Sequence, residues 1–235
     1  MKTLRLILGD QLNPDHSWFK TVREDVVYLM AEMRQETDYA PHHIQKVVAF
    51  FAAMRHFANR RKAEGHKLLY YRLTDPDNPQ TLPTLVKDAV EKEGCTRFEY
   101  QLPDEYRLDE QLKNLCQELD MPTGVSDTEH FYSTREELAR HFEGKKQLVM
   151  ESFYRMMRKK HGVLFDNGAP TGGSWNYDAQ NRKKWNGTPP IPSIAIPDQD
   201  IGTILKEIQE SGINTIGALD AGSFQWTTTP EDARD

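Results

Sequence analysis

The sequence has few cysteines and lacks the motifs that mark many catalytic and metal sites. Its two cysteines, Cys95 and Cys116, are too few for a disulfide framework or a four-cysteine cluster, and no CxxC pair occurs. We interpret both as buried or incidental thiols. No set of Cys and His residues has zinc-ligand spacing, and no GxSxG pentapeptide is present. These absences argue against a common zinc module and against a hydrolase with a nucleophile elbow.

Phosphate-binding motifs are missing as well. No GxGxxG comes after the first apolar run, and GxxxxGK with a subsequent Ser or Thr does not occur. Both motifs provide glycine-rich backbone that cradles the phosphates of dinucleotides or triphosphates. An NAD or ATP site of the usual kind is therefore not expected.

Long apolar runs and a strong net charge are also absent. No run approaches the roughly 18 to 20 apolar residues that cross a bilayer. Met1-Lys2-Thr3 leads directly into a short apolar run, without the apolar core and cleavage site of a signal peptide. We expect a cytoplasmic protein without membrane contact. Because the net charge is -6, any contact with DNA has to come from a local basic patch.

Short apolar runs alternate with stretches of helical periodicity, and this alternation predicts an α/β fold. Five strands are expected, at residues 4–8, 25–30, 67–73, 97–102 and 123–126. Helices are expected from Pro41 to about Glu64, from Leu82 to Glu93, and from the loop at 103–107 to Leu119. We predict a Rossmann-like, five-stranded parallel sheet with strand order 3-2-1-4-5, flanked by helices.

The second part of the chain has a different character. Two further helices are expected, one from Thr134 and one from about Leu148 to His161. Residues 163–197 are rich in Gly, Pro and Asn, which is typical of an interdomain connector or an extended surface segment. We therefore divide the chain into an α/β domain, residues 1–162, and a connector with the start of another domain, residues 163–235. A last amphipathic stretch runs from Ile201 to Gly212.

The predicted strand order places a switch point between the first and fourth strands, where ligands bind in such sheets. Loops at residues 9–12, 32–39 and 103–107 should converge there. They offer acceptors, an amide and an aromatic ring, and a helix adds an aromatic displaced from its apolar stripe. This set suits a neutral heterocycle or ribityl compound better than a polyphosphate. The candidate contacts are Gly9, Asp10, Gln11, Glu32, Glu36, Tyr39, Phe50 and Glu105.

Each candidate also has a structural interpretation. Gly9 can permit a tight bend, and Asp10 can cap the next element of the chain. Glu32 and Glu36 can be solvated loop carboxylates, and Phe50 can be an ordinary core residue. The adjacent histidines at 42 and 43 lie on different sides of a helix start, so we interpret them as surface or capping residues and not as metal ligands.

Basic residues lie close to aromatic ones in the second half of the chain. Residues 158–161 (Arg-Lys-Lys-His) and 182–184 (Arg-Lys-Lys) flank Trp175, Tyr177 and Trp185. This arrangement suits contact with a nucleic-acid backbone and an unstacked base, with Arg182, Lys183 and Lys184 as candidates. The alternative is a solvated helix face and an ordinary loop after it.

Four blocks, in order, resemble the photolyase-related family of bacterial iron–sulfur cryptochromes and photolyases. They are LILGDQL at residues 6–12, the run at 39–57 with HHxxK and AMRHF, MExFYRxMR at 150–158, and GGxWNYDAxNR at 172–182. The similarity spans about residues 4–185. The joint occurrence of the blocks is specific, whereas any single block would be weak.

The resemblance implies an N-terminal α/β antenna domain and a helical C-terminal domain that holds FAD and a four-iron cluster. Family members repair (6-4) pyrimidine dimers in DNA or act as light sensors. The implied antenna ligand is 6,7-dimethyl-8-ribityllumazine, and its implied pocket uses Gly9, Asp10, Gln11, Glu32, Glu36, Tyr39 and Phe50, with Glu105 close by. Arg182 falls where the interdomain loop of the family approaches the DNA lesion.

The chain departs from the family pattern near Asp235, where the helical half is expected to begin. The FAD pocket and the cluster cysteines are not in this sequence, so we expect an N-terminal piece that harvests light but does not repair DNA alone. Its expected partners are its own C-terminal helical domain and, through the full-length protein, DNA. The alternatives are a non-catalytic nucleic-acid or protein interaction module and, less favoured, a small nucleotide-binding enzyme of the same architecture.

Overall fold

The structure, a computed structural model, describes residues 1–182, 184–193 and 199–234. Contacts divide the chain into two compact units, the first formed by Met1–Glu129 with Ala195–Asp235 and the second by His130–Ile194. The predicted boundary at residue 162 refers to the domains of the family and stays a prediction.

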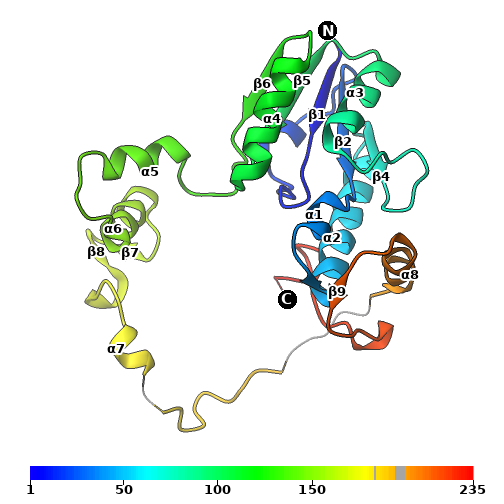
Figure 1. Cartoon of the computed structure of the whole chain (residues 1–235). Helices are drawn as coiled ribbons and strands as arrows, with labels where there is room; N and C mark the ends of the chain where they lie inside the picture. The colour runs from blue at the N-terminus through cyan, green and yellow to red at the C-terminus, as the bar shows by residue number, and fades with distance from the viewer. Residues whose placement is uncertain (183, 194–198, 235) are drawn as a thin grey trace. The chain divides into compact units, whose positions relative to one another are not determined.

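The first unit is built on a five-stranded parallel sheet with the order β4-β2-β1-β5-β6 (Figure 1). Its strands are β1 (Thr3–Leu6), β2 (Val26–Ala31), β4 (Leu68–Tyr71), β5 (Arg97–Gln101) and β6 (Thr123–Ser126). The central strand β1 places Leu4 between Val27 of β2 and Phe98 of β5. The predicted α/β class and the strand order 3-2-1-4-5 are confirmed.

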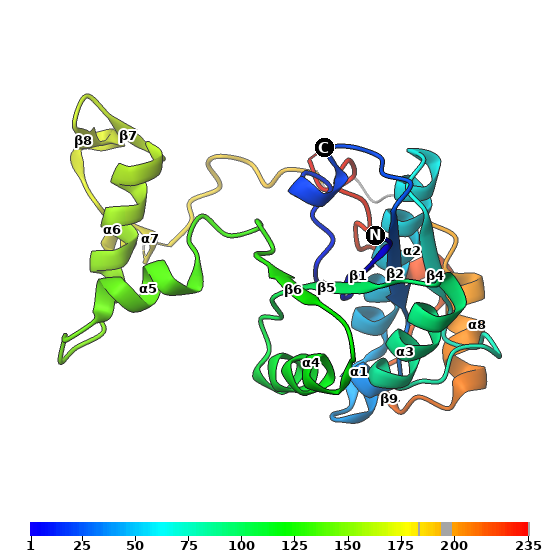
Figure 2. The same ribbon diagram turned by 90° about the horizontal axis from the view of Figure 1, so that it is seen from above.

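Both faces of the sheet are covered by helices, which explains why β2 and β4 are apolar at every position. Val26, Tyr28 and Met30 point into a core shared with α2 (Ile44–Ala63). Val27 and Leu29 point into a second core shared with α3 (Leu82–Glu93) and α4 (Tyr106–Glu118). Figure 2 shows α3 and α4 on one side of the sheet.

Helix α2 begins three residues later than the sequence predicts. His42 and His43 form a short strand, β3, that pairs in parallel with β9 (Thr215–Ile216). His43 then caps the helix, because its Nδ1 accepts a hydrogen bond from the backbone N–H of Gln45 at 3.3 Å. The predicted start at Pro41 is therefore wrong, and the reason is a strand pairing with residues far along the chain.

The segment after residue 198 completes the core on the α2 face of the sheet. Its helix α8 (Gly202–Ser211) packs on α2 through Ile204 and Ile208, and Phe224 joins the same core. The predicted amphipathic stretch is thus a helix of the first unit. The remaining short elements of this unit are η1 (Ser17–Phe19), α1 (Gln35–Asp38) and η3 (Ala221–Ser223).

The second unit contains α5 (Arg135–Phe142), α6 (Met150–His161), β7 (Phe165–Asp166), β8 (Ala169–Pro170), η2 (Thr171–Gly173) and α7 (Asp178–Asn181). Thr134 caps α5 by accepting from the N–H of Glu137 at 3.2 Å, as its sequence predicts. Buried Arg158 donates to the carbonyls of Val163 and Leu164 and so holds the turn after α6. None of the helices in the described part of the chain is long and apolar enough to cross a membrane.

Candidate functional site

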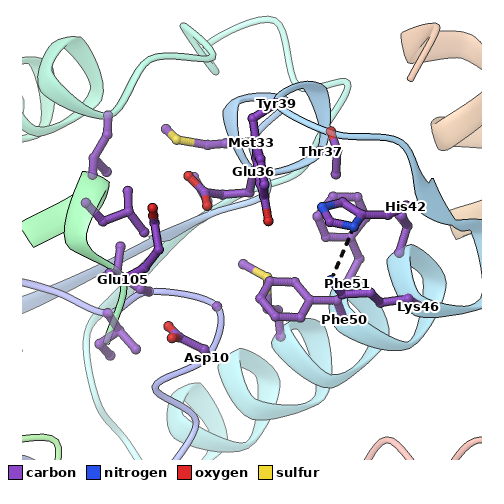
Figure 3. A pocket seen from close by; sticks show the side chains of 18 of the residues that line it. Asp10, Met33, Glu36, Thr37, Tyr39, His42, Lys46, Phe50, Phe51 and Glu105 are labelled. Carbon is purple, nitrogen blue, oxygen red and sulfur yellow. Dashed lines mark hydrogen bonds between the residues drawn. The ribbon is translucent and has the colours of Figure 1, made fainter. Parts of the chain in front are cut away.

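A cavity of about 220 Å³ lies beyond the carboxyl ends of β1, β2 and β5 (Figure 3). Gly9 and Asp10 reach it from the loop after β1, and Glu36 reaches it from α1, which comes after β2. Glu105 and Arg107 reach it from the start of α4, which comes after β5. The structure therefore brings together the loops on either side of the switch point between β1 and β5.

The apolar part of the cavity is formed mainly by α2 and the strand ends. Its members include Leu8, Met33, Phe50, Met54 and Leu108. A row of lining side chains, Lys46, Phe50 and Met54, runs along one face of α2 at a spacing of four residues. Aromatic and thioether groups give this wall the character of a site for a flat apolar ring.

Gly9 is required by close packing. A Cβ atom at this position would overlap the ring of Phe50 and lie 2.8 Å from Sδ of Met54. Its φ lies outside the left-handed region, so conformational freedom is not the reason for glycine here. The loop after β1 can lie against the Phe50 ring only because residue 9 has no side chain.

Three carboxylates and one guanidinium form the polar part of the cavity. Nη2 of Arg107 lies 3.1 Å from Oε2 of Glu36 and 3.1 Å from Oε2 of Glu105. The Arg107 guanidinium also lies over the ring of Tyr39, with Cζ 5.0 Å from the centroid. Burial raises the pKa of Glu36; Arg107 opposes the shift, whereas Glu105 and Asp10 add to it. These groups can accept hydroxyl hydrogens and donate to a ring carbonyl.

His42 and Lys46 complete the lining at the beginning of α2. Nζ of Lys46 lies 3.2 Å from Nδ1 of His42, and Figure 3 shows the pair beside Phe50. The interpretation of the adjacent histidines as capping or surface residues is right for His43, which caps α2 and is exposed. His42 instead faces the cavity, because the β3 pairing turns the two imidazoles to different sides.

The cavity lining does not include two of the predicted contacts, Gln11 and Glu32. Gln11 is 1% exposed; its side chain accepts from the N–H of Leu8 at 3.0 Å and donates to the carbonyl of Gln101 at 3.1 Å. It therefore ties the end of β1 to the end of β5. The geometry does not support a ligand contact for Gln11.

Glu32 is 0% exposed, so its interpretation as a solvated loop carboxylate is wrong. Its carboxylate accepts from Nε of Arg55 at 2.6 Å, from the hydroxyl of Tyr70 at 2.7 Å and from the N–H of Leu73 at 3.0 Å. With these oxygens already used, Glu32 joins β2, α2 and the end of β4. Glu32 therefore stabilises the elements around the cavity and is not part of its lining.

Comparison with known proteins identifies the family of the chain. The family described as deoxyribodipyrimidine photo-lyase-related protein matches residues 5–226. This chain belongs to that family. The resemblance carried by the four sequence blocks is thereby confirmed.

The chain covers different shares of two relatives. It is 31% identical over 233 residues to a (6-4) photolyase of Agrobacterium fabrum (strain C58 / ATCC 33970), covering 97% of this chain and 46% of the relative. It is 24% identical over 196 residues to an uncharacterized protein of Acanthamoeba polyphaga mimivirus, covering 78% of this chain and 95% of that protein. The photolyase-related chain thus spans about half the length of the photolyase that it matches.

The structure adds lining residues of the photolyase-related chain that sequence reasoning missed. Arg107 lies in the loop predicted to reach the crevice, and a cation next to Glu105 and Tyr106 was a usable signal. Lys46 and Met54 are spaced by four residues from Phe50, so the position of Phe50 was a usable signal for this face of α2. The side chain of Met33 is buried as well as lining the cavity, and no sequence pattern marked it.

The predicted nucleic-acid residues of the photolyase-related chain belong to the second unit. Arg182 and Lys184 are exposed, and Lys183 lies outside the described residues. The cations that pack on Trp175 come from α6: Cζ of Arg155 lies 5.4 Å from the ring centroid, Cζ of Arg158 lies 5.3 Å from it, and Nζ of Lys159 lies 5.5 Å from it. The basic and aromatic residues of this unit are thus partly engaged with each other.

Proposed function

We propose that the first unit binds 6,7-dimethyl-8-ribityllumazine and acts as the light-harvesting domain of a photolyase-like flavoprotein. The observation that carries the proposal is the composition of the cavity at the switch point. An apolar wall with an aromatic ring faces carboxylates and a guanidinium, and the sequence lacks both GxGxxG after its first strand and GxxxxGK with a subsequent Ser or Thr. Membership of the photolyase-related family supports the same assignment.

The ring of such a ligand matches the apolar wall. Phe50 and Met54 offer a flat, polarizable surface, and Met33 adds a buried thioether. Ring carbonyls and ring nitrogens need donors, and Arg107 can donate because its guanidinium has more N–H groups than its two carboxylate partners use. The residues present therefore fit the heterocycle.

The ribityl chain matches the carboxylates. Asp10, Glu36 and Glu105 offer acceptors for hydroxyl hydrogens, and burial favours the protonated form of Glu36, which can also donate. Asp10 and Glu105 repel a terminal phosphate. Tyr39, 61% exposed, marks the solvent side of the lining. A hydroxylated, unphosphorylated tail is therefore the better fit.

In this proposal the protein positions the chromophore and excludes water from its ring. When bound, the chromophore supplies absorption of near-ultraviolet or blue light and transfer of the excitation to a flavin. The acceptor would be FAD, held with a four-iron cluster by the helical domain that the family resemblance implies. Light-driven DNA repair or blue-light sensing would then be the task of the complete protein, and the name of the Agrobacterium relative, a (6-4) photolyase, supports the former.

The test is a titration of the purified chain with the lumazine. Binding in the cavity should shift the absorption band and change the fluorescence yield, because a stacked aromatic ring and nearby charges alter the excited state. The change should saturate at one ligand per chain. Spectra that stay unchanged at saturating protein would contradict the proposal.

A second candidate function is contact with nucleic acid through the second unit. Arg182 and Lys184 are exposed, and Trp185 is 55% exposed beside them. Exposed cations next to an aromatic ring suit a phosphate backbone and a stacked base. We would measure binding of the chain to single-stranded and duplex DNA at several salt concentrations, with Arg182→Gln and Lys184→Gln as variants. Absence of binding at low salt would exclude this function for the chain.

A further inference from the structure

The loop from Met33 to His43 contributes a large share of the cavity lining. Its lining members are Met33, Glu36, Thr37, Tyr39 and His42. The regular structure within it is α1, a single turn of four residues, and β3, a pair of residues. A turn this short has little intrinsic stability. The position of the loop therefore depends on the contacts that hold it from outside.

The first external attachment is made by Arg34. Its Nη1 donates to the carbonyl of Ser211 at 2.9 Å, across 177 positions of sequence. Ser211 is the last residue of α8, where carbonyls have no partner within the helix and the helix dipole favours a cation. The same guanidinium binds Asp38 through Nε at 3.0 Å and so closes the α1 turn. Arg34 thus joins the loop to the end of α8.

The second attachment is the pairing of β3 with β9. His42 pairs with Thr215 and His43 with Ile216. The next residue, Gly217, has a φ of +80°, and a Cβ there would overlap the imidazole of His43. The strand can approach the loop this closely only because residue 217 is glycine.

Helix α8 is itself fixed independently of the loop. Glu207 is buried and pairs with Arg55, which also binds Glu32. Ile204 and Ile208 of the same helix lie in the core with α2. The end of α8 is therefore a firm anchor for Arg34, and the anchor lies outside the cavity.

From these contacts we propose that Arg34 is a positioning residue of the ligand site and that α8 with β9 forms its support. They keep the loop at 33–43 in the arrangement that binds ligand, although neither Arg34 nor any described residue of α8 or β9 is in the cavity lining. The identity of the ligand rests on the proposed function. Loss of the support lowers the fraction of chains competent to bind, and the apparent Kd rises in inverse proportion to that fraction.

The first experiment measures the Kd for 6,7-dimethyl-8-ribityllumazine in variants of the full chain. Arg34→Ala and Gly217→Val break one attachment each. If either lowers the competent fraction to about one tenth, its Kd rises about tenfold. Arg34→Lys keeps a cation for the Ser211 carbonyl and should restore part of the affinity.

The matched control is Arg60→Ala. Arg60 pairs with Glu231, so this change also removes an arginine that holds the C-terminal segment, but it lies away from the loop. Its Kd should equal that of the wild type. An Arg34→Ala variant with wild-type affinity, or an Arg60→Ala variant that is weakened as much, would overturn the proposal.

The second experiment needs no ligand and separates the two proposals. Hydrogen exchange at the amides of residues 34–40 should be faster in Arg34→Ala and unchanged in Arg60→Ala, with the strands of the sheet protected equally in both. If the wild type does not bind the lumazine, the chromophore assignment fails and the exchange result alone decides the role of Arg34. Equal exchange in Arg34→Ala and wild type overturns it. If Gly217→Val does not fold, the comparison of Ala and Lys at position 34 remains decisive.

Discussion

Arg107 and Glu36 form an ion pair at 3.1 Å that joins the start of α4 to α1 at the polar side of the cavity. The pair is not isolated, because Glu105 lies at the same distance from the guanidinium and Asp10 contributes to the electrostatics of Glu36. Burial raises the free energy of the charged form of Glu36, and Arg107 offsets part of this cost. Ligand binding and stability should therefore both respond to changes in this arrangement and in the packing behind it.

Replacing Glu36 with alanine should weaken lumazine binding. The change removes an acceptor for a ligand hydroxyl and leaves Arg107 with one carboxylate partner less. A hydrogen bond to a charged group is worth about 1.5–3 kcal/mol, so the Kd should rise about tenfold or more. Fluorescence titration measures this. Glu110→Ala, which removes a carboxylate of α4 that pairs with Lys113, is the control and should bind as the wild type does.

Glu36 should also lower the stability of the ligand-free protein as the pH rises above the usual glutamate pKa of 4.5. Its pKa is raised in the folded state, mainly by burial, so the folded chain holds the proton at pH values where the unfolded chain has lost it. The contribution of Glu36 to the free energy of unfolding is fully present below pH 4.5. It is lost as the pH rises from 4.5 through the raised pKa of the folded state. Urea midpoints of wild type and Glu36→Gln, measured from about pH 4 to 7, should diverge in favour of the variant. Parallel curves would contradict the assignment.

Gly9→Ala should reduce ligand affinity substantially, although the substitution adds only one methyl group. The new methyl group overlaps the Phe50 ring and has to displace it, and the cavity lies beside that ring. Overpacking of this kind costs about 1–3 kcal/mol of stability. Gly222→Ala is the control, because a Cβ there meets nothing within 4 Å. Isothermal titration and thermal unfolding of both variants test the prediction, which fails if the two behave alike.

Glu32→Ala should destabilise the fold rather than act through ligand contact. It leaves the guanidinium of Arg55 with Glu207 but without its fully buried partner. Breaking a buried pair costs about 3–5 kcal/mol, whereas an exposed pair is worth about 0–1 kcal/mol. Glu118→Ala, which breaks the exposed pair with Lys87, is the comparison. Equal urea midpoints for the two variants would show that the Glu32 cluster does not hold the structure.

A terminal phosphate on the ligand should weaken binding. Repulsion from a carboxylate at contact distance is on the order of 1 kcal/mol even in water, and Arg107 and Lys46 offset part of it, so we expect a weakening of roughly a few-fold. Riboflavin and its 5′-phosphate make a matched pair, since they differ only in the phosphate. Competition of each against the bound lumazine gives the ratio. Preference for the phosphate would place the tail of the ligand away from Asp10, Glu36 and Glu105.

The sheet was predictable because its signals are local. The second strand, β2, is a short apolar run buried on both faces, and the right-handed crossover rule leaves few orders for five strands that alternate with helices. The beginning of α2 was not predictable in this way. The residues from Pro41 to His43 have the sequence pattern of a helix start. Pairing of His42 with Thr215 gives backbone N–H and C=O groups of both segments hydrogen-bond partners, which favours a strand here.

The sequence by itself determined the α/β class, the strand order and the edge of the sheet where the cavity lies, since apolar periodicity and loop positions depend on neighbouring residues. Only the tertiary structure decided which acids face the cavity. Glu32 and Glu36 are four positions apart in the sequence. Glu32 is buried in an ion pair with Arg55 of α2, whereas Glu36 lines the cavity in an ion pair with Arg107 of α4. That choice depends on cations from distant helices, whose positions are set by the packing of the whole unit.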